Sequence, residues 1–390
     1  MSYNPGMLRK KRASVLLIVL VTIAFASLAL VAFIDRASND LLVAARAAEA
    51  NRLRADAYSA LEVTLGVLNE FIQVDGALHS PAEGWSDPLA FAGYEPASGR
   101  TIEVTFEDES GKLSLPHADA NQLTTLFTSW GVAQADAEQL ADALLTWMRK
   151  DHVASTDAGT ADYDRAAVPY AAPQRSLRSF DELAAIDFVN KKFYDENGQP
   201  NDLWHQFAST FSLYDFNPPN LNSAGSGALT ALGQADPTLQ QQLSSYLKGT
   251  GDYKQQGPGY FKTTADANNL FGAQAVPQGV GTQILALRII VTVHEDNSSF
   301  RLETVVTQQN QAKAIASTES VTQSNGTITN TPGVPTTANN SPGTANPADN
   351  GNSVTNAVQL NYPFTLLEVH EEIIDNLAKP PPSPDSPPPT

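Results

Sequence analysis

The sequence contains no cysteine among its 390 residues. This absence excludes disulfide bonds, thiolate nucleophiles, zinc–thiolate sites and iron–sulfur clusters. Basic residues are scarce, since 24 Lys and Arg face 42 Asp and Glu and give a formal net charge of -18. Binding to nucleic acid needs clustered basic side chains that displace counterions from phosphates. The only dense basic run is residues 9–12 (RKKR), so we predict that nucleic acid is not a partner.

Sequence motifs of common catalytic sites are missing as well. The chain has no Gly-x-Ser-x-Gly elbow, no phosphate-binding loop and no His-Glu-x-x-His motif. Its six histidines are scattered without the spacing of metal ligands. Catalysis needs a constellation of reactive groups, so the sequence predicts that the chain is not an enzyme.

A long uncharged run stands near the N-terminus, over residues 13–34 (ASVLLIVLVTIAFASLALVAFI). As a helix it is about 33 Å long, enough to cross a hydrocarbon core of about 30 Å. The basic run before it predicts a cytoplasmic N-terminus, with the bulk of the chain beyond the membrane. A cleaved secretory signal is the alternative. Its apolar region is usually about 7–15 residues long and ends at a small-residue cleavage site, and no clean site interrupts this run.

The helical pattern continues through residues 35–78. Mostly apolar side chains recur there at spacings of three and four, which places them on one face of a helix. This stripe consists of Leu41, Ala45, Ala48, Arg52, Ala57, Leu61, Leu65, Leu68 and Ile72. We therefore predict one long helix whose second half packs on the exported domain and forms a rigid unit with it.

The body of the chain mixes loop, strand and helix patterns. Residues 81–98 are interpreted as a loop. Residues 100–107 alternate apolar and polar, and residues 112–115 follow a polar turn, so we predict a β-hairpin. A capping box of Ser179 and Glu182 predicts the start of a helix. Further helices are predicted over residues 119–130, 134–149, 202–209, 227–232 and 237–247.

The strongest strand patterns, residues 284–294 and 300–307, are rich in β-branched side chains and joined by a polar turn. Residues 308–356 are almost purely Thr, Asn, Ser, Pro, Gly and Ala. Such a composition buries too little apolar surface to offset chain entropy, so we predict disorder. Strand pattern returns in residues 357–378, and a proline-rich tail follows.

The order of these segments resembles a known family. The basic run with SVLLIVLVTIAFASLAL is similar to a class III leader and membrane helix. The stretches FEDESGKLSLP, ALLTWMRKD, SFDEL and NPPNLNSAGSGALTAL resemble, in this order, the family's hairpin, its tryptophan-bearing helix, its capped helix and a later strand and helix. The family is the type II secretion minor pseudopilin called general secretion pathway protein K. The likeness spans residues 9–307 and resumes at residue 357.

The resemblance implies an α/β (α+β) fold, in which a pilin-like long N-terminal helix packs on an antiparallel sheet with a large, mostly helical insert. Along this chain it implies a leader (1–13), a transmembrane helix (14–34), its amphipathic continuation (35–78), the first part of the sheet domain (79–117), the insert (118–275), sheet strands (276–307), a low-complexity loop (308–356), a final strand region (357–378) and a tail (379–390).

The resemblance also implies processing and partners. Prepilin peptidase would cut between Ala13 and Ser14, although leaders of this class usually end in glycine. The helix, with Leu17, Ile18 and Val21 in its first turns, would leave the inner-membrane lipid and pack on other minor pseudopilins. Most pilins carry Glu where Ile18 stands. An apolar side chain cannot pair with a buried ammonium group, which agrees with a place at the pseudopilus tip.

We therefore predict a minor pseudopilin of the inner membrane that caps the pseudopilus tip and acts in protein export through the periplasm. Two alternatives stay open, namely a membrane-anchored binding or adhesion domain that never polymerises and an exported hydrolase. Leader cleavage separates the pseudopilin from the anchored domain. A hydrolase needs a cluster of polar catalytic residues that the sequence does not contain.

One acidic loop is a candidate metal site. Asp151, Asp157, Asp162 and Asp164 surround Gly159, and hard oxygen ligands in a flexible loop suit Ca²⁺. The resemblance implies calcium there as well. The spacing does not fit an EF-hand, and most acidic loops are simply solvated, so a loop without a metal is the alternative.

Overall fold

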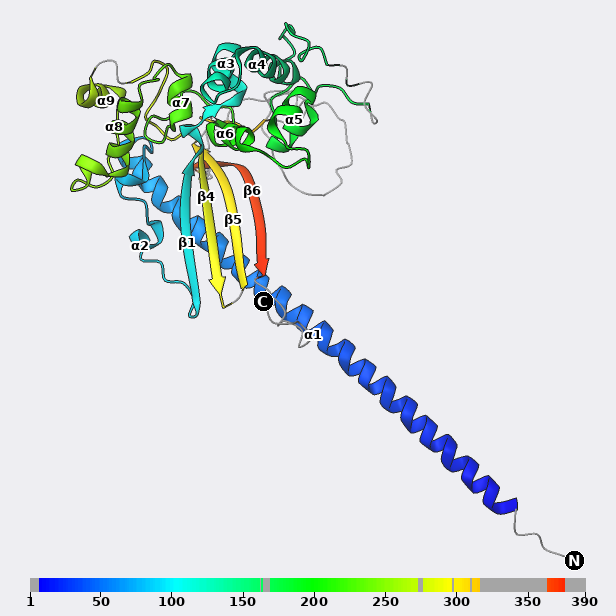
Figure 1. The fold of residues 1–390 in the computed structure, drawn as a ribbon. Coiled ribbons are helices and arrows are strands. Elements are labelled where there is room, and N and C mark those ends of the chain that lie inside the picture. Colours follow the sequence, from blue (N-terminus) through cyan, green and yellow to red (C-terminus); the bar gives the residue numbers. More distant parts are fainter. Residues whose placement is uncertain are drawn as a thin grey trace, which may run out of the picture. The chain divides into compact units, whose positions relative to one another are not determined.

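The computed structural model describes residues 7–161, 163, 169–272, 276–296, 298–308, 311–315 and 363–375 (Figure 1). Several predictions from the sequence fall outside this part of the chain. They concern the start of the leader, Asp162, Asp164, nearly all of residues 308–356, the beginning of the final strand region and the tail.

A single helix, α1 (Met7–Asp75), occupies the N-terminal part of the chain, as the periodicity predicts. It ends because Gly76 adopts a φ of +83°, in the left-handed region that favours glycine. The N–H of Gly76 donates to the carbonyl of Ile72 at 2.7 Å. The helix therefore stops slightly before residue 78, where the sequence pattern placed its end.

The chain divides into two compact units. The first comprises residues 1–107, 288–305 and 368–390, and the second comprises residues 108–287 and 306–367. The predicted insert, residues 118–275, lies within the second unit.

The first unit combines α1 with most of a four-stranded sheet. The strands are β1 (Arg100–Asp108), β4 (Leu287–Glu295), β5 (Ser298–Gln308) and β6 (Phe364–Asp375), in the spatial order β1-β4-β5-β6. Figure 1 shows neighbouring strands running in opposite directions. Alternate residues of β4 and β5 form the buried face. These residues are Ile289, Val291, Val293, Phe300 and Leu302.

Helix α1 is bonded to both edge strands of this sheet. Asp56 forms an ion pair of 2.5 Å with Arg100 of β1, and Arg54 forms one of 2.8 Å with Glu371 of β6. Leu53, Leu61 and Leu65 of α1 are buried. The predicted fold class, a long helix with an antiparallel sheet and a helical insert, is confirmed.

The predicted hairpin of residues 100–107 and 112–115 is wrong. Strand β2 (Leu113–Ser114) pairs in parallel with β3 (Phe211–Ser212), and β1 pairs with β4. Glu109, Ser110 and Gly111 of the predicted polar turn are buried. Glu109 accepts a hydrogen bond from the Ser212 hydroxyl, and the Ser110 hydroxyl oxygen accepts one from the Leu285 N–H at 3.0 Å. These contacts keep the chain in the second unit after Asp108 and prevent the return to β1.

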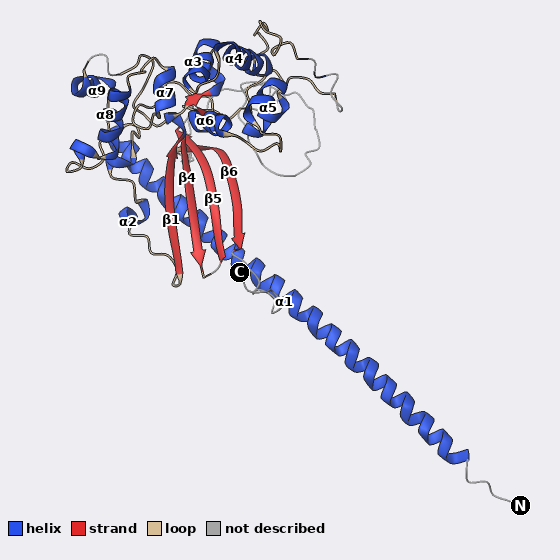
Figure 2. Cartoon of the chain, viewed as in Figure 1, coloured by secondary structure: helices blue, strands red, loops and turns tan. Residues whose placement is uncertain are grey.

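The second unit is built mainly from helices and the loops that connect them (Figure 2). The helices are α3 (Ala120–Ser129), α4 (Gln134–Met148), α5 (Asp187–Phe193), α6 (Asp202–Thr210), α7 (Ser226–Ala231), α8 (Pro237–Lys248) and α9 (Thr264–Phe271). The sequence predicted α3, α4, α6, α7 and α8 and missed α5 and α9. Phe127, Phe193 and Phe207 are fully buried and lie in mutual ring contact within one hydrophobic core of this unit.

Two local expectations fail. The segment after Ser179 is a 3₁₀ helix (Phe180–Ala185) without a capping box. The carboxylate of Glu182 accepts from the Arg178 N–H at 3.0 Å and from Arg175 at 3.1 Å, so it is not available to Ser179. Residues 81–98 contain two short helices, Pro81–Glu83 and α2 (Pro88–Ala92), each started by proline near its first position.

Candidate functional site

The N-terminal half of α1 is exposed along its length. Leu17, Ile18 and Val21, the predicted assembly residues, expose 64%, 58% and 40% of their surface. The backbone of Ala13 and Ser14, the predicted cleavage site, lies within the helix. An 18-residue window of the helix reaches a mean hydropathy of 2.9. Long apolar exposure of this kind is unfavourable in water, so the helix fits a single-pass membrane anchor.

Exposed apolar residues continue beyond the predicted membrane helix. Leu41, Leu42 and Val43 expose 71%, 59% and 68% of their surface. Burial begins only at Leu53, which is 1% exposed. The predicted packing of the stripe is therefore right from Ala57 onward, although Ile72 is only half-buried, and wrong for Leu41, Ala45, Ala48 and Arg52, which are exposed.

Two side chains of α1 bind a carboxylate of β6. Nε of Arg54 donates to both oxygens of Glu371 at 3.0 and 2.9 Å, and the Tyr58 hydroxyl donates at 2.6 Å. The hydrogen bonds from Arg54 and then Tyr58 lower the pKa of Glu371. On the same face of β6, two positions to either side, Val369 and Ile373 stay 45% and 56% exposed.

Asp142 of α4 organises the loop that contains two of the predicted calcium ligands. The residue is 4% exposed. Oδ1 accepts from Nε2 of His152 at 2.7 Å and from the Ser155 N–H at 3.1 Å. Oδ2 accepts from the N–H and the hydroxyl of Thr156 at 2.8 and 2.7 Å. Burial acts to raise the pKa of Asp142, but the hydrogen bonds from His152, Thr156 and Ser155 outweigh it and lower the pKa to about 2.

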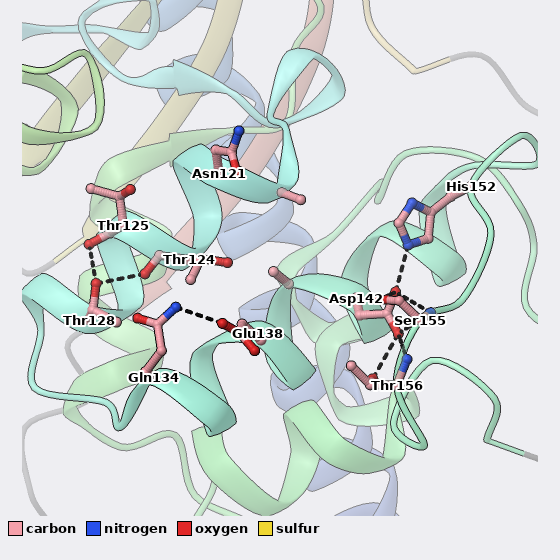
Figure 3. Close-up of a pocket in the computed structure, with 12 residues that line it drawn as sticks. Asn121, Thr124, Thr125, Thr128, Gln134, Glu138, Asp142, His152, Ser155 and Thr156 are labelled. Carbon is pink, nitrogen blue, oxygen red and sulfur yellow. Dashed lines mark hydrogen bonds and ion pairs between the residues drawn. The ribbon is translucent and has the colours of Figure 1, made fainter.

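An open pocket of about 590 Å³ lies beside this loop (Figure 3). Helix α3 contributes Thr124, Thr125 and Thr128, and α4 contributes Gln134 and Glu138. Hydrogen bonds within each helix already engage several of these groups, since Gln134 donates to Glu138 at 2.7 Å and Thr128 donates to the Thr124 carbonyl at 2.8 Å. The pocket is therefore a polar groove lined by α3, α4 and the loop after α4, and hydrogen bonds to Asp142 fix the loop side.

The structure does not gather the predicted calcium ligands that it describes. Asp151 and Asp157 are exposed, and the described residues contain no group of three His, Cys, Asp or Glu that could hold a metal ion. Sequence reasoning missed Asp142. It could have been found as the one acidic residue among the buried positions of α4, because a charge on an apolar helix face needs a partner.

A second carboxylate joins two of the motifs on which the family resemblance rests. Asp108, from FEDESGK, accepts from the Ser110 N–H at 2.8 Å and from Asn220 of NPPNLNS at 2.7 Å. The hydroxyls of Ser110 and Ser223 donate to it as well. Burial raises the pKa of Asp108 to about 6 against the lowering effect of these hydrogen bonds. Residues distant in sequence thus form one polar junction in the second unit.

The comparisons with known proteins concern the same region. Residues 106–196, which contain Asp108, α4 and the Asp142 loop, match the family described as Type II secretion system (T2SS), protein K. The resemblance to this family is confirmed. Protein K is a structural, non-catalytic component of the secretion system, and the match supports a minor pseudopilin role in type II secretion.

One solved structure with a similar chain is the crystal structure of the GspK-GspI-GspJ complex from the enterotoxigenic Escherichia coli type 2 secretion system. The identity is 14% and the TM-score is 0.46, over 67% of this chain and 93% of the other. A search of curated proteins gave no match to the chain.

Proposed function

We propose that the chain is a minor pseudopilin that caps the tip of a type II secretion pseudopilus. The observation that carries this proposal is the exposed apolar surface of α1, which extends from the predicted membrane helix to Leu41, Leu42 and Val43. Apolar surface in this position is stabilised by lipid over its first part and by the helices of partner subunits over the rest. Other minor pseudopilins, with helices of the same kind, are the partners that fit.

The orientation follows from charge. The run of residues 9–12 holds the N-terminus in the cytoplasm, and the chain beyond the membrane helix lies in the periplasm. Prepilin peptidase removes residues 1–13, and the mature helix begins at Ser14 in the inner membrane. Ile18 offers no carboxylate to the N-terminal ammonium group of another subunit, which supports a terminal place in the assembly. The helical insert adds bulk that prevents a further subunit from joining above.

Burial of Leu41, Leu42 and Val43 against partner helices supplies the attraction outside the membrane. Each of these side chains gains about 1.5–3 kcal/mol when fully buried. The gain is lost if the residues stay in water, so a subunit that never assembles would retain a costly surface. A membrane-anchored domain that does not polymerise leaves this exposure unexplained.

Leader cleavage is the first test. The N-terminal sequence of the full chain is determined from membranes of cells with and without a prepilin peptidase. We expect a mature chain that begins at Ser14 only when the peptidase is present. A chain that begins at Met1 in both cells would contradict the proposal and favour an anchored domain. A start well beyond Ile34 would indicate a cleaved export signal.

Assembly is the second test. Replacing Leu41, Leu42 and Val43 together by serine should reduce co-purification with other minor pseudopilins, while the thermal midpoint stays unchanged because these side chains are mostly exposed. Val153→Ser is the matched control, since Val153 is 83% exposed in the second unit. Equal co-purification of the triple variant and the control would contradict the role of this surface.

A further inference from the structure

The carboxylate of Asp142 is fully engaged by donors from its own loop. Oδ1 receives the His152 ring N–H, the Ser155 N–H and the Ser155 hydroxyl, and Oδ2 receives both donors of Thr156. The Ser155 N–H also lies 3.1 Å from Oδ2. A carboxylate offers about four lone-pair positions, so these donors occupy the positions that a cation would need.

The geometry of the donors is incompatible with a metal at this point. A calcium ligand must direct a lone pair at the ion, whereas each N–H here directs a hydrogen atom at the carboxylate. Two of the donors are backbone amides, which cannot rotate away. Charge-assisted hydrogen bonds to a carboxylate are also roughly twice as strong as those between neutral groups.

Gly159, the residue around which the aspartates cluster, has a different role from that of a metal-loop glycine. Its backbone lies against the Asp142 carboxylate, and a Cβ at this position would meet Cγ of Asp142 at 2.8 Å and Cβ of Ala154 at 3.0 Å. Its φ is not in the left-handed region, so glycine is needed here for close approach and not for backbone conformation. The Gly159 N–H extends the network by donating to the Thr156 hydroxyl at 3.3 Å.

We propose that Asp142 takes the place of a metal ion in this loop, so that the order of residues 149–160 is independent of divalent cations. The negative group at the centre is a helix side chain, and the loop supplies the hydrogen-bond donors around it. This reverses the arrangement predicted from the sequence, in which loop aspartates surround a cation. The same hydrogen bonds hold the His152, Ser155 and Thr156 wall of the polar groove.

Limited proteolysis of the full chain in detergent tests this proposal without any variant. The rate of cleavage between residues 149 and 160 is compared after treatment with EDTA and after addition of millimolar CaCl₂. We expect equal rates, and an equal thermal midpoint, in both conditions. Faster cleavage in EDTA that CaCl₂ reverses would overturn the proposal, because the loop would then depend on a bound cation.

Variants separate the two sources of order. Asp142→Asn places an amide against fixed N–H donors and should speed loop cleavage about tenfold or more, with no rescue by CaCl₂. Thr156→Val removes one donor and serves if Asp142→Asn does not fold. The double variant Asp151→Asn with Asp157→Asn is the matched control and should cleave at the wild-type rate. Cleavage of the Asp142→Asn variant at the wild-type rate, together with faster cleavage of the double variant, would overturn the proposal.

Discussion

Asp108 and Asp142 are two partly or fully buried carboxylates of the same unit, and their pKa values move in opposite directions. Burial raises the pKa of Asp108 to about 6, whereas hydrogen bonds outweigh burial at Asp142 and lower its pKa to about 2. Asp142 accepts from two backbone amides, the His152 ring and two hydroxyls. Asp108 accepts from one backbone amide, the Asn220 side chain and two hydroxyls, so it has one backbone amide fewer and no imidazole among its donors.

Around Asp142 the donors include the N–H groups of Ser155 and Thr156 and the ring of His152. Backbone amides are fixed, so a proton on either oxygen of Asp142 would point toward an N–H donor that cannot turn away. Hydroxyls donate to both carboxylates, those of Ser110 and Ser223 to Asp108 and those of Ser155 and Thr156 to Asp142, and each can turn and accept a proton instead. The additional backbone amide and the imidazole at Asp142 favour its charged form, whereas burial dominates at Asp108.

Removal of the Asp142 carboxylate should have the largest effect. Asp142→Ala leaves two backbone amides and an imidazole without their acceptor and should lower the free energy of unfolding by about 3 kcal/mol. Urea denaturation followed by tryptophan fluorescence measures this loss, since Trp147 lies on the same helix. Asp151→Asn is the control and should stay within about 0.5 kcal/mol of wild type. Equal losses of unfolding free energy in both variants would contradict a central role of Asp142 in holding the loop.

The contributions of the two carboxylates to stability should depend on pH in opposite directions. A depressed pKa stabilises the fold above the unfolded value, so the contribution of Asp142, about 2 kcal/mol, is lost as pH falls from about 4 to 2. A raised pKa acts in the opposite sense, so the contribution of Asp108 is present below about pH 4 and is lost as pH rises through 6.

Urea denaturation between pH 2 and 8 measures both windows, with variants as references. The difference between wild type and Asp142→Asn should shrink below about pH 4, and the difference between wild type and Asp108→Asn should change between about pH 4 and 6. Differences that stay constant over each window would show that the folded-state pKa values are not shifted.

Two glycines provide a matched pair. A Cβ at Gly159 would meet Asp142, and a Cβ at Gly111 would lie 2.7 Å from the carbonyl oxygen of Ser223 beside Asp108. Each alanine variant should lose about 1–3 kcal/mol of unfolding free energy, because backbone or a held carboxylate has to move. Gly225→Ala is the control, since a Cβ there meets nothing within 4 Å. Wild-type stability in both variants would mean that the close approaches relax at little cost.

The smallest effect is expected for Asp108→Asn at neutral pH. An amide resembles the protonated acid, and the hydroxyls of Ser110 and Ser223 can reorient toward it, so the change should be about 1 kcal/mol or less. Urea denaturation at pH 7, side by side with Asp142→Asn, measures it. A loss as large as that of Asp142→Asn would show that the donors around Asp108 are as fixed as those around Asp142.

Periodic segments could be predicted from the sequence. The stripe that ends with Leu65 and Leu68 indicated the long helix, and the alternation in residues 100–107 indicated β1, because both patterns record burial of one face. Pairing partners could not be predicted. The sequence pattern predicted that residues 112–115 fold back and pair with β1. Contacts of Glu109 with Ser212 and of Ser110 with Leu285, which are distant along the chain, hold the segment elsewhere.

The candidate sites divide in the same way. Exposure of Leu17, Ile18 and Val21 follows from an uncharged run too long for a domain core of this composition. The carboxylates of Asp151 and Asp157 are suitable cation ligands. Their spacing does not show, however, which side chain from another element binds the loop. Asp142, placed on α4, supplies that partner through hydrogen bonds that no spacing rule contains.

By itself, the sequence determined the long apolar helix, its amphipathic continuation, the strand and helix periods and the resemblance to the secretion family. Each depends on the properties of neighbouring residues, which the chain carries locally. Only the tertiary structure decided where α1 becomes buried, which strands pair and which carboxylate holds the acidic loop. These outcomes depend on contacts between residues far apart in the chain, where geometry and donor direction select one partner among many of similar chemistry.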